Sequence, residues 1–323
     1  MTKNKFRVWK RVLLWTGAAA AVILLAASGL TYYLYSSAQQ TAGKMYEELG
    51  PVKPVYVSKD TEVRNAKTPE QPVQMKRLDP FTVLVLGVDQ REHDSGRSDS
   101  MIVLSVNPVK GSILMFNIPR DTRTAIVGHA DVDKINHAYA FGGVQMSVAT
   151  VEHFLDYPID YFVKINMESF ARLIDLVGGV EVDNPVEFDY DGTVFAKGNL
   201  SLNGQDALKY ARMRYDDPRG DIGRNARQRT ILKQLMNKAT DISNVTHLQS
   251  LLSELGNYVK TNITFSEMKT FVKDYGPAIR KVDSIEIKGA GQTIDRIWYY
   301  IVSEAERDRI HNLLKAHQLK SSA

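Results

Sequence analysis

Hydrophobic and polar positions divide the chain into an apolar N-terminal run, a polar segment and a long region of mixed periodicity. From Val12 to Tyr35 there is no charged residue and no proline, and these 24 residues, at the helical rise, extend about 36 Å, enough to cross the hydrocarbon core of a bilayer. Aromatic residues stand near both ends, as expected of interfacial anchors: Trp9, Trp15, Tyr32, Tyr33 and Tyr35. The pattern predicts a transmembrane signal-anchor helix at 12–35.

The basic tail, residues 1–11, is expected to stay in the cytoplasm, which places everything after the span outside. A cleaved signal peptide is the alternative, but its apolar core usually has only about 7–15 residues. Residues 36–77 contain four prolines and few large aliphatic residues. We interpret them as an extracytoplasmic stalk with a short helix at Met45–Leu49, followed by a folded domain at 78–317 and a C-terminal tail at 318–323.

The domain begins with runs that are apolar enough for strands covered on both faces: Phe81–Gly87, Met101–Val106 and Ile113–Ile118. Later strands are expected at Val180–Val182, Ser284–Lys288 and Ile297–Val302. Helical spacing is found at Val144–Asp156, Met167–Val177 (capped by Asn166), Gln205–Ala211, an arginine-rich segment ending near Lys238, His247–Val259 and Glu304–His317. This order predicts a three-layer α/β domain, with a central mixed β-sheet flanked by helices.

Six residues, 107–112, join the second and third strands, which predicts a hairpin of antiparallel neighbours. If the first strand is also antiparallel to the second, three strand ends meet at one edge of the sheet. That edge would carry Asp89, Arg91, Arg97, Asp99, Arg120 and Asp121. The loop from 89 to 98 would also permit a parallel first strand, so two arrangements stay open.

Asp89 and Asp99 are the candidate metal ligands at this edge, because Mg²⁺ (or Mn²⁺) takes one or two protein carboxylates together with phosphate oxygens and water. Each of them alone could instead cap a strand end. A metal flanked by arginines is the arrangement used in phosphoryl transfer. Lys134 and Asn136, in the segment KINHAY, could reach the same site or could have a structural role between a loop and a helix.

The segment from Arg212 to Arg229, RMRYDDPRGDIGRNARQR, holds six arginines and no lysine. A guanidinium group matches phosphate oxygens bidentately and keeps its charge, whereas lysine would serve equally well as a merely solvated charge. The segment therefore favours a phosphate site. The alternative is a solvated face on which the arginines pair with the aspartates of the same segment.

Helical spacing further narrows the set of residues in this segment that are candidates for binding phosphate. Arg224, Arg227 and Gln228 share one stripe with Ile231 and Leu235, so the cationic residues continue a buried face. The N-terminus of such a helix adds free N–H groups and a positive dipole. Two arginines fall outside the predicted site: Arg229 is expected to be exposed, and Arg219 can be satisfied on the surface by Asp217 or Asp221.

Charge and motifs exclude several classes of protein. Residues 1–11 carry five positive charges and no negative charge, so subtracting them from the net charge of +4 leaves −1 for the rest of the chain, which argues against nucleic acid as a partner. The chain has no cysteine and hence no disulfide, and it lacks HExxH, GxxxxGK[ST] and GxSxG motifs. We therefore expect no zinc site, no P-loop and no serine acyl transfer.

Seven blocks, in order over about residues 80–240, resemble the LytR–CpsA–Psr family of bacterial cell-wall proteins. They are FTVLVLGVDQR, GRSDSMIVLSVN, FNIPRDT, DKINHAYAFGG, LVGGVEVDNP, LNGQDALKYARMR and DIGRNARQR. The chain looks most like the teichoic-acid transferase branch of Gram-positive bacilli. The resemblance implies transfer of a glycopolymer, as a phosphodiester, from a polyprenyl-pyrophosphate carrier to a peptidoglycan hydroxyl by a single-pass protein of the cell membrane.

The resemblance implies that Asp89 and Asp99 take part in binding the magnesium and the pyrophosphate. The phosphates are bound by arginines, with Gln228 beside them: Arg91, Arg120, Arg212, Arg214, Arg224 and Arg227. Asp99 and Asp121 are both candidates for the general base. Two other functions keep the same site, namely a carrier or sensor of polyprenyl phosphates and a pyrophosphate hydrolase. A transcriptional regulator is disfavoured by the outward topology and the nearly neutral domain.

Overall fold

The computed structural model describes residues 28, 31–50, 56–66, 78–89, 96–239, 256 and 258–319. A six-stranded sheet forms its centre, in the order β11-β6-β1-β2-β3-β12. The strands are β1 (Phe81–Asp89), β2 (Arg97–Asn107), β3 (Ser112–Asn117), β6 (Tyr161–Asn166), β11 (Val259–Thr261) and β12 (Lys281–Ser284). β1 is antiparallel to β2, and β2 to β3, while β6 runs parallel to β1 and β12 parallel to β3. The predicted mixed sheet is confirmed.

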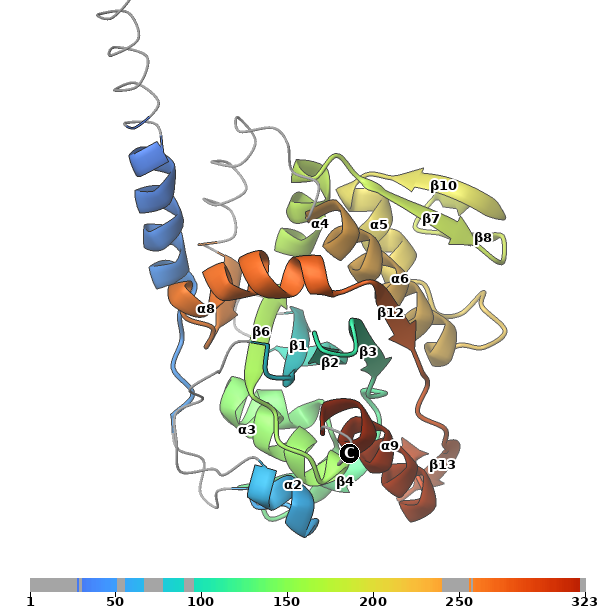
Figure 1. Ribbon diagram of the computed structural model, residues 1–323. Helices are drawn as coiled ribbons and strands as arrows, with labels where there is room; N and C mark the ends of the chain where they lie inside the picture. Colours follow the sequence, from blue (N-terminus) through green and yellow to red (C-terminus); the bar gives the residue numbers. More distant parts are fainter. Residues whose placement is uncertain are drawn as a thin grey trace, which may run out of the picture.

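Helices cover both faces of this sheet (Figure 1). On one face lie α3 (His137–Leu155) and α9 (Glu304–Gln318), over a core that includes Leu84, Leu86 and Phe116. On the other face lie α4 (Met167–Leu176), α5 (Gly204–Arg212) and α6 (Asp221–Ala239). Strand residues alternate between the two cores, which is why the strands are apolar throughout.

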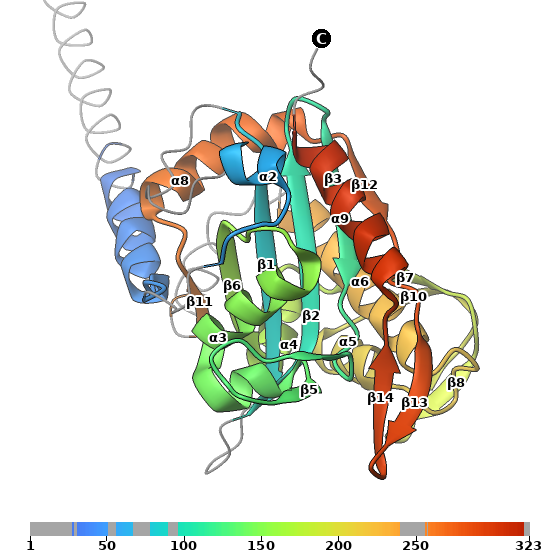
Figure 2. The same cartoon turned by 90° about the horizontal axis from the view of Figure 1, so that it is seen from below.

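Short strand pairs extend from this domain. β7 (Val180–Asn184) pairs with β10 (Gly198–Leu202), and β8 (Phe188–Tyr190) pairs with β9 (Thr193–Phe195). β4 (Arg123–Ala125) pairs with β5 (Val132–Lys134), and β13 (Ala290–Ile294) pairs with β14 (Ile297–Ile301). Figure 2 shows the β13–β14 hairpin projecting at the end of the sheet where β1 ends and β2 begins. The candidate site lies at this end of the sheet, where β1 ends and β2 begins.

Several element boundaries differ from the predicted ones. α3 begins at His137, before the predicted start, and is broken by non-helical backbone at Gly142 and Gly143. The predicted strand 284–288 was misplaced: β12 ends at Ser284. Most of the predicted helix 247–259 lies outside the described residues, and Val259 already belongs to β11. Strand β6 was missed because YFVKIN is short and its second half contains Lys164 and Asn166.

The segment expected to form a stalk packs in part against the domain. Residues 31–45 are helical, so the short helix predicted from Met45 ends where it was expected to begin. Tyr46 then bridges to Thr261, and Val63 of α2 (Thr61–Ala66) is fully buried in the core below α3. The described residues contain no helix both long and apolar enough to span a membrane, and the predicted span 12–35 lies mostly outside them.

The C-terminal helix is attached to the sheet through a partly buried histidine. His317 Nδ1 lies 2.7 Å from Ser105 Oγ, and its Nε2 lies 3.0 Å from Ser112 Oγ. Burial, reinforced by the positive charge of Lys110, lowers the pKa of His317 to about 4. The folded state therefore favours the neutral ring.

Stability of the fold should consequently depend on pH. Because the folded pKa of His317 is below its unfolded value, the stabilisation is complete above about pH 6.5 and is lost as the pH falls towards 4. The ring keeps some contact with solvent, so we expect a loss of about 1–2 kcal/mol. Thermal unfolding followed between these pH values checks this: His317→Asn should show a weaker pH dependence, and an equal slope in both proteins would contradict it.

Candidate functional site

A β-bulge places Asp99 at the predicted sheet edge. Gly87 pairs with Ser100 and Val88 pairs with Ser98, so Asp99 is the extra residue of β2. Bulges redirect a side chain and are common beside active sites. A Cβ at Gly87 would lie only 2.9 Å from the Cβ of Ser100, so glycine permits the close approach of the strands there. Of the two arrangements left open for the first strand, the structure shows the antiparallel one, which brings Asp89 and Asp99 to the same pocket.

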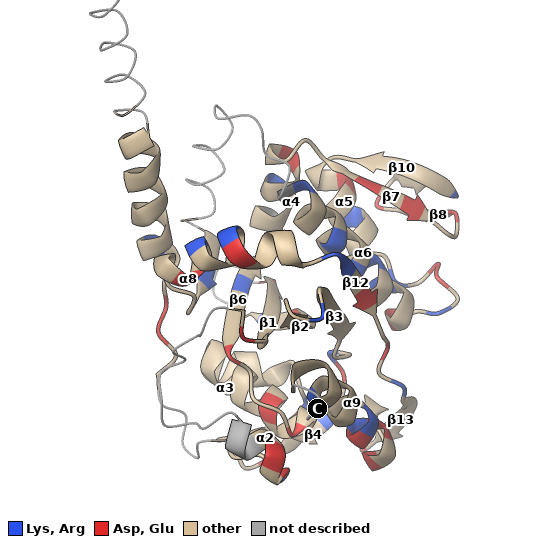
Figure 3. Cartoon of the chain, in the orientation of Figure 1, with Lys and Arg blue, Asp and Glu red and all other residues tan. Residues whose placement is uncertain are grey.

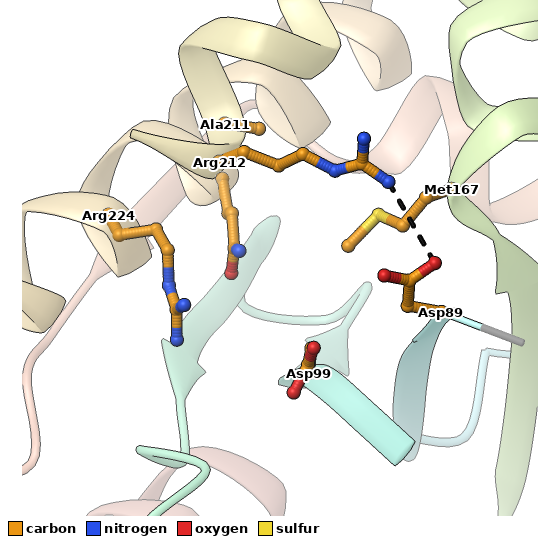
Figure 4. Close-up of a pocket in the computed structure, with 7 residues that line it drawn as sticks. Asp89, Asp99, Met167, Ala211, Arg212 and Arg224 are labelled. Carbon is orange, nitrogen blue, oxygen red and sulfur yellow. Dashed lines mark ion pairs between the residues drawn. The ribbon is translucent and has the colours of Figure 1, made fainter. Parts of the chain in front are cut away.

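These two carboxylates line an open pocket of about 300 Å³ between the sheet edge and the helices on one face (Figure 4). β1 and β2 provide the carboxylates, the start of α4 provides Met167, and the end of α5 and the first turns of α6 provide the remaining wall. The lining residues are Asp89, Asp99, Met167, Ala211, Arg212, Arg224 and Gln228. The pocket therefore presents carboxylates on one side and guanidinium groups on the other.

Each carboxylate of the pocket has an arginine beside it. Arg212 Nη2 lies 3.9 Å from Asp89 Oδ1, and Arg120 Nη1 donates to Asp99 Oδ1 at 2.8 Å. Burial disfavours the charge of Arg120, but the carboxylates of Asp99 and Asp121 outweigh it and raise the pKa of the guanidinium. Arg120 Nε is nevertheless buried without a hydrogen-bond acceptor in the described part of the chain.

Arg224 is the least satisfied cation of the pocket. Its side chain is only 8% exposed, and its partner is Asp221, at 2.5 Å from Nη2. That ion pair is not aligned as a hydrogen bond, so Nε and Nη2 have no acceptor among the described residues. Burial lowers the pKa of Arg224, and the positive charges of Arg120 and Arg214 act in the same direction. An anion in the pocket would supply both the missing acceptors and the missing negative charge.

Gln228 is held in one orientation at the base of the pocket. Its Oε1 accepts hydrogen bonds from Ser100 Oγ at 2.9 Å and Asn117 Nδ2 at 3.3 Å. With the oxygen occupied by two donors, the amide nitrogen is the part that can donate into the pocket. Gln228 therefore adds a neutral donor beside Arg224.

Arg227, which was predicted to bind pyrophosphate, is not among the residues that line the pocket. Its Nη1 donates to Asp217 Oδ2 at 2.6 Å, while Nε and Nη2 donate to the backbone carbonyls of Tyr210 and Met213. The side chain of Asp217 is 1% exposed, and a Cβ at Gly223 would lie 1.8 Å from its Oδ2. Arg227 thus connects the end of α5 to the turn before α6, and Gly223 leaves room for the carboxylate.

Arg229 was predicted to be exposed, and this prediction was wrong. It is buried, with Nη1 donating to Asn117 Oδ1 at 2.9 Å and Nη2 to Glu286 Oε1 at 3.0 Å. The segment after β12 covers this side of α6, which the period of the helix could not reveal. Arg219 lies on the surface and pairs with Asp217, as one of the two predicted partners.

The other predicted site residues lie around the pocket. Asp121 is buried behind Arg120, 3.7 Å from its Nε, and forms an ion pair with Lys134 Nζ at 2.7 Å. Asn136 is buried at the start of α3, where its backbone N–H donates to the carbonyl of Arg120. Arg97 is exposed opposite Asp89, Arg214 stacks over Tyr215, and Arg91 lies outside the described residues.

Three residues of the site were not identified from the sequence. Met167 forms part of the wall, and Asp221 is the partner of Arg224. Asp217 anchors Arg227. A signal existed for Asp221, because an acid in the first turn of a helix, three residues before an arginine, favours pairing. Asp217 was predicted only as a partner of Arg219, and no local signal marks its pairing with Arg227.

The pocket meets the requirements of a magnesium site only together with a ligand. Within the described residues, no group of three or more His, Asp or Glu side chains could hold a metal. Asp89 and Asp99 supply two carboxylates on one wall, and Mg²⁺ commonly completes such a pair with phosphate oxygens and water. The donor set therefore fits a metal bound jointly with a phosphate.

Comparisons with known proteins agree with this geometry. The model of the LytR_cpsA_psr family matches residues 32–316. The polyisoprenyl-teichoic acid–peptidoglycan teichoic acid transferase TagU of Bacillus subtilis is 41% identical over 314 residues, which cover 97% of this chain and 98% of that protein.

Solved structures give the same result for the fold. The crystal structure of Bacillus subtilis TagU matches with a TM-score of 0.63 and 44% identity, covering 76% of this chain and 99% of that one. A structure of TagT bound to LIIa-WTA matches with a TM-score of 0.65 and 28% identity, over 77% of this chain and 96% of that one.

Proposed function

Because this chain belongs to the LytR_cpsA_psr family, we propose that it transfers a teichoic-acid-type glycopolymer from a polyprenyl-pyrophosphate carrier to a peptidoglycan hydroxyl, as a phosphodiester. The observation that carries the proposal is the pocket in which the buried, unsatisfied N–H groups of Arg224 face the carboxylates of Asp89 and Asp99. A pyrophosphate group would satisfy these donors. The names of the relatives supply the glycopolymer and the acceptor.

The arginines orient the donor in this proposal. Arg224 and Arg212 contact oxygens of the pyrophosphate, Gln228 donates from the base of the pocket, and Arg120 stabilises the charge that develops when the bond between the two phosphates breaks. Donors fixed before the reaction stabilise such charge without further reorganisation. Arg214 does not line the pocket, but its positive charge acts on Arg224 and would add to the attraction for the phosphates.

The acceptor hydroxyl attacks the phosphorus on the glycopolymer side, and polyprenyl phosphate leaves. Of the two candidate bases, Asp99 lines the pocket, whereas Asp121 is held behind Arg120 by Lys134. We therefore assign the hydroxyl proton to Asp99. Lys134 and Asp121 keep Arg120 in place.

Asp89 and Asp99 would hold Mg²⁺ or Mn²⁺, which when bound neutralises charge on the phosphates. Removal of divalent ions by a chelator is expected to lower transfer at least about a hundredfold, in line with the size of single electrostatic contributions in catalysis. Readdition of Mg²⁺ should restore it. Mn²⁺ binding, followed by electron paramagnetic resonance with pyrophosphate present, should weaken in Asp89→Asn. Unchanged binding in that variant would contradict the ligand assignment.

The proposed location is the cell membrane of a Gram-positive bacterium. The uncharged run 12–35 would be the single span, with residues 1–11 in the cytoplasm and the domain outside. This topology places the pocket on the side of the membrane where peptidoglycan is assembled. A reporter that is active only outside the cytoplasm tests this topology. We expect activity when it is fused to the C-terminus and none when it is fused to the N-terminus.

One assay separates transfer from its alternatives. The full chain, Mg²⁺ and a labelled lipid-linked donor are incubated with and without peptidoglycan. We expect label on the wall polymer, and only when the acceptor is present. Free glycopolymer phosphate in both arms would indicate a pyrophosphate hydrolase, and unchanged donor in both would indicate a carrier or sensor; either result would overturn the proposal.

A further inference from the structure

The N-terminal helix contacts the domain at the point where the apolar run ends. Tyr35, the last residue of that run, packs its ring against Phe265 of α8 (Phe265–Thr270), with ring centroids 5.4 Å apart. Lys269 Nζ lies 3.4 Å from Tyr35 Oη and 5.0 Å from the centre of the Phe265 ring. Figure 1 shows the N-terminal helix beside α8. α8 is thus fixed within side-chain contact of the predicted membrane boundary.

The headgroup layer of a bilayer is about as thick as the distance over which Tyr35 contacts α8. Headgroups add about 5–8 Å to each side of the hydrocarbon core. Tyrosines commonly anchor at this level, and Tyr32, Tyr33 and Tyr35 are all exposed. A segment that touches Tyr35 therefore lies at or next to the headgroup layer if the run 12–35 spans the membrane.

Charges on the segment that follows are separated by sign. From α8 through the π-turn Phe271–Tyr275 to Arg280, the exposed residues include three cations, Lys269, Lys273 and Arg280. Glu267, in contrast, is turned to the protein, where it accepts from Tyr161 Oη at 2.7 Å and from Thr264. Asp274 is partly buried. Figure 3 shows both basic and acidic residues along the chain from α8 to β12.

An exposed aliphatic side chain lies among these cations. Val272 is 79% exposed, while Phe271 and Tyr275 on either side of it pack into the core beneath the sheet. The segment thus combines a firmly attached inner face with a cationic outer face that carries an apolar residue. Surfaces of this kind bind anionic lipid headgroups and insert an apolar side chain between them.

We propose that the outer face of residues 266–280 rests on anionic headgroups of the membrane that carries the chain. The proposal goes beyond the transfer reaction and rests on the proposed span at 12–35. Attachment at two points, the span and this face, limits rotation of the domain about its anchor. The pocket would then keep one orientation towards a lipid-linked donor.

The absence of cysteine from the chain permits a direct test. Val272→Cys introduces a single site for an environment-sensitive fluorophore, and Val194→Cys, on β9 and 66% exposed, is the matched control. The full chain is reconstituted in vesicles of phosphatidylcholine alone or mixed in equal parts with phosphatidylglycerol. We expect a blue shift, and quenching by spin-labelled lipid, at position 272 in the mixed vesicles and not at position 194.

Neutralising the cations tests the electrostatic part. Lys273→Gln and Arg280→Gln should each lower the ratio of docked to undocked domain about fivefold, as one basic residue does near an anionic surface. Lys197→Gln, an exposed lysine between β9 and β10, should leave it unchanged. Equal fluorescence changes at positions 272 and 194 would overturn the proposal. So would a fluorescence change at position 272 that depends neither on lipid charge nor on these substitutions. The readout needs no donor, so it is independent of whether transfer occurs.

Discussion

Replacement of Arg224 by methionine is expected to reduce transfer at least about a hundredfold with little loss of stability of the fold. Electrostatic donors that act on a transition state are typically worth about 10²–10³ in rate. Little stability should be lost, because Arg224 Nε and Nη2 have no hydrogen-bond acceptor among the described residues and the substitution removes only the ion pair with Asp221. Burial already disfavours the charge of Arg224, so an apolar side chain of similar length relieves that cost.

The measurement compares initial transfer rates and urea unfolding of the two proteins. Arg307→Met is the matched control, since Arg307 lies on α9, stacks on Phe154 and donates to backbone carbonyls far from the pocket. It should keep its transfer rate and lose some stability. If Arg224→Met transferred at the normal rate, or if it unfolded as readily as a variant of a fully paired arginine, Arg224 would not be the principal anion-binding group of the pocket.

The sequence predicted much of the sheet edge, because that part of the site depends on local order, but it left the direction of the first strand open. Short connections and apolar runs placed β1, β2 and β3, and their ends brought Asp89, Asp99 and Arg120 together. The bulge that turns Asp99 could not be foreseen. It depends on the approach of Gly87 to Ser100 across two strands, which no spacing along the chain records.

The arginines of α6 show where periodicity becomes insufficient. The period of the helix correctly predicted that Arg224 and Gln228 line the pocket. Arg227 was expected in the pocket and Arg229 in solvent, but both side chains are buried in ion pairs away from the pocket. A helix in contact with other elements on several sides has several buried faces, and its period does not say which face meets the ligand. The partners that decide this, Asp217 and Glu286, come from a turn and from a distant segment.

The polar segment before the domain illustrates a related limit. Its prolines and scarce aliphatic residues indicated a stalk, yet Met45 and Val63 enter hydrophobic cores, and Asp60 forms ion pairs with His311 and Lys315 of α9. Two separated apolar residues and one ion-pair network are too little signal for a pattern of hydrophobic positions. They are enough to attach the segment to the domain.

Removing the carboxylate of Asp217 should cost about 3–5 kcal/mol, the usual effect of leaving a buried charge without its partner. The side chains of Asp217 and Arg227 are 1% and 5% exposed, and the carboxylate also accepts from Arg219. Burial opposes the negative charge, but Arg219 and Arg227 outweigh it and lower the pKa of Asp217. Asp217→Asn preserves the shape and removes the charge, so urea unfolding of this variant measures the pairing itself.

A double-mutant cycle identifies the partner. If Asp217 acts through Arg227, the losses of Asp217→Asn and Arg227→Met should together exceed the loss of the double variant by about 2 kcal/mol, within the range found for residues in contact. The same cycle with Arg229→Met should be additive, because Arg229 pairs with Glu286 instead. Additivity in both cycles would refute the connection.

Transfer by Asp217→Asn should fall as well, through weaker binding of the donor. Arg227 holds the carbonyls of Tyr210 and Met213, and these two residues flank the stretch that contains Arg212, so loss of the pairing frees the arginine that lies against Asp89. The Michaelis constant for the donor should rise more than the turnover number falls. A core variant of equal stability loss, such as Leu314→Ala on α9, should leave that constant unchanged, since general destabilisation does not move Arg212.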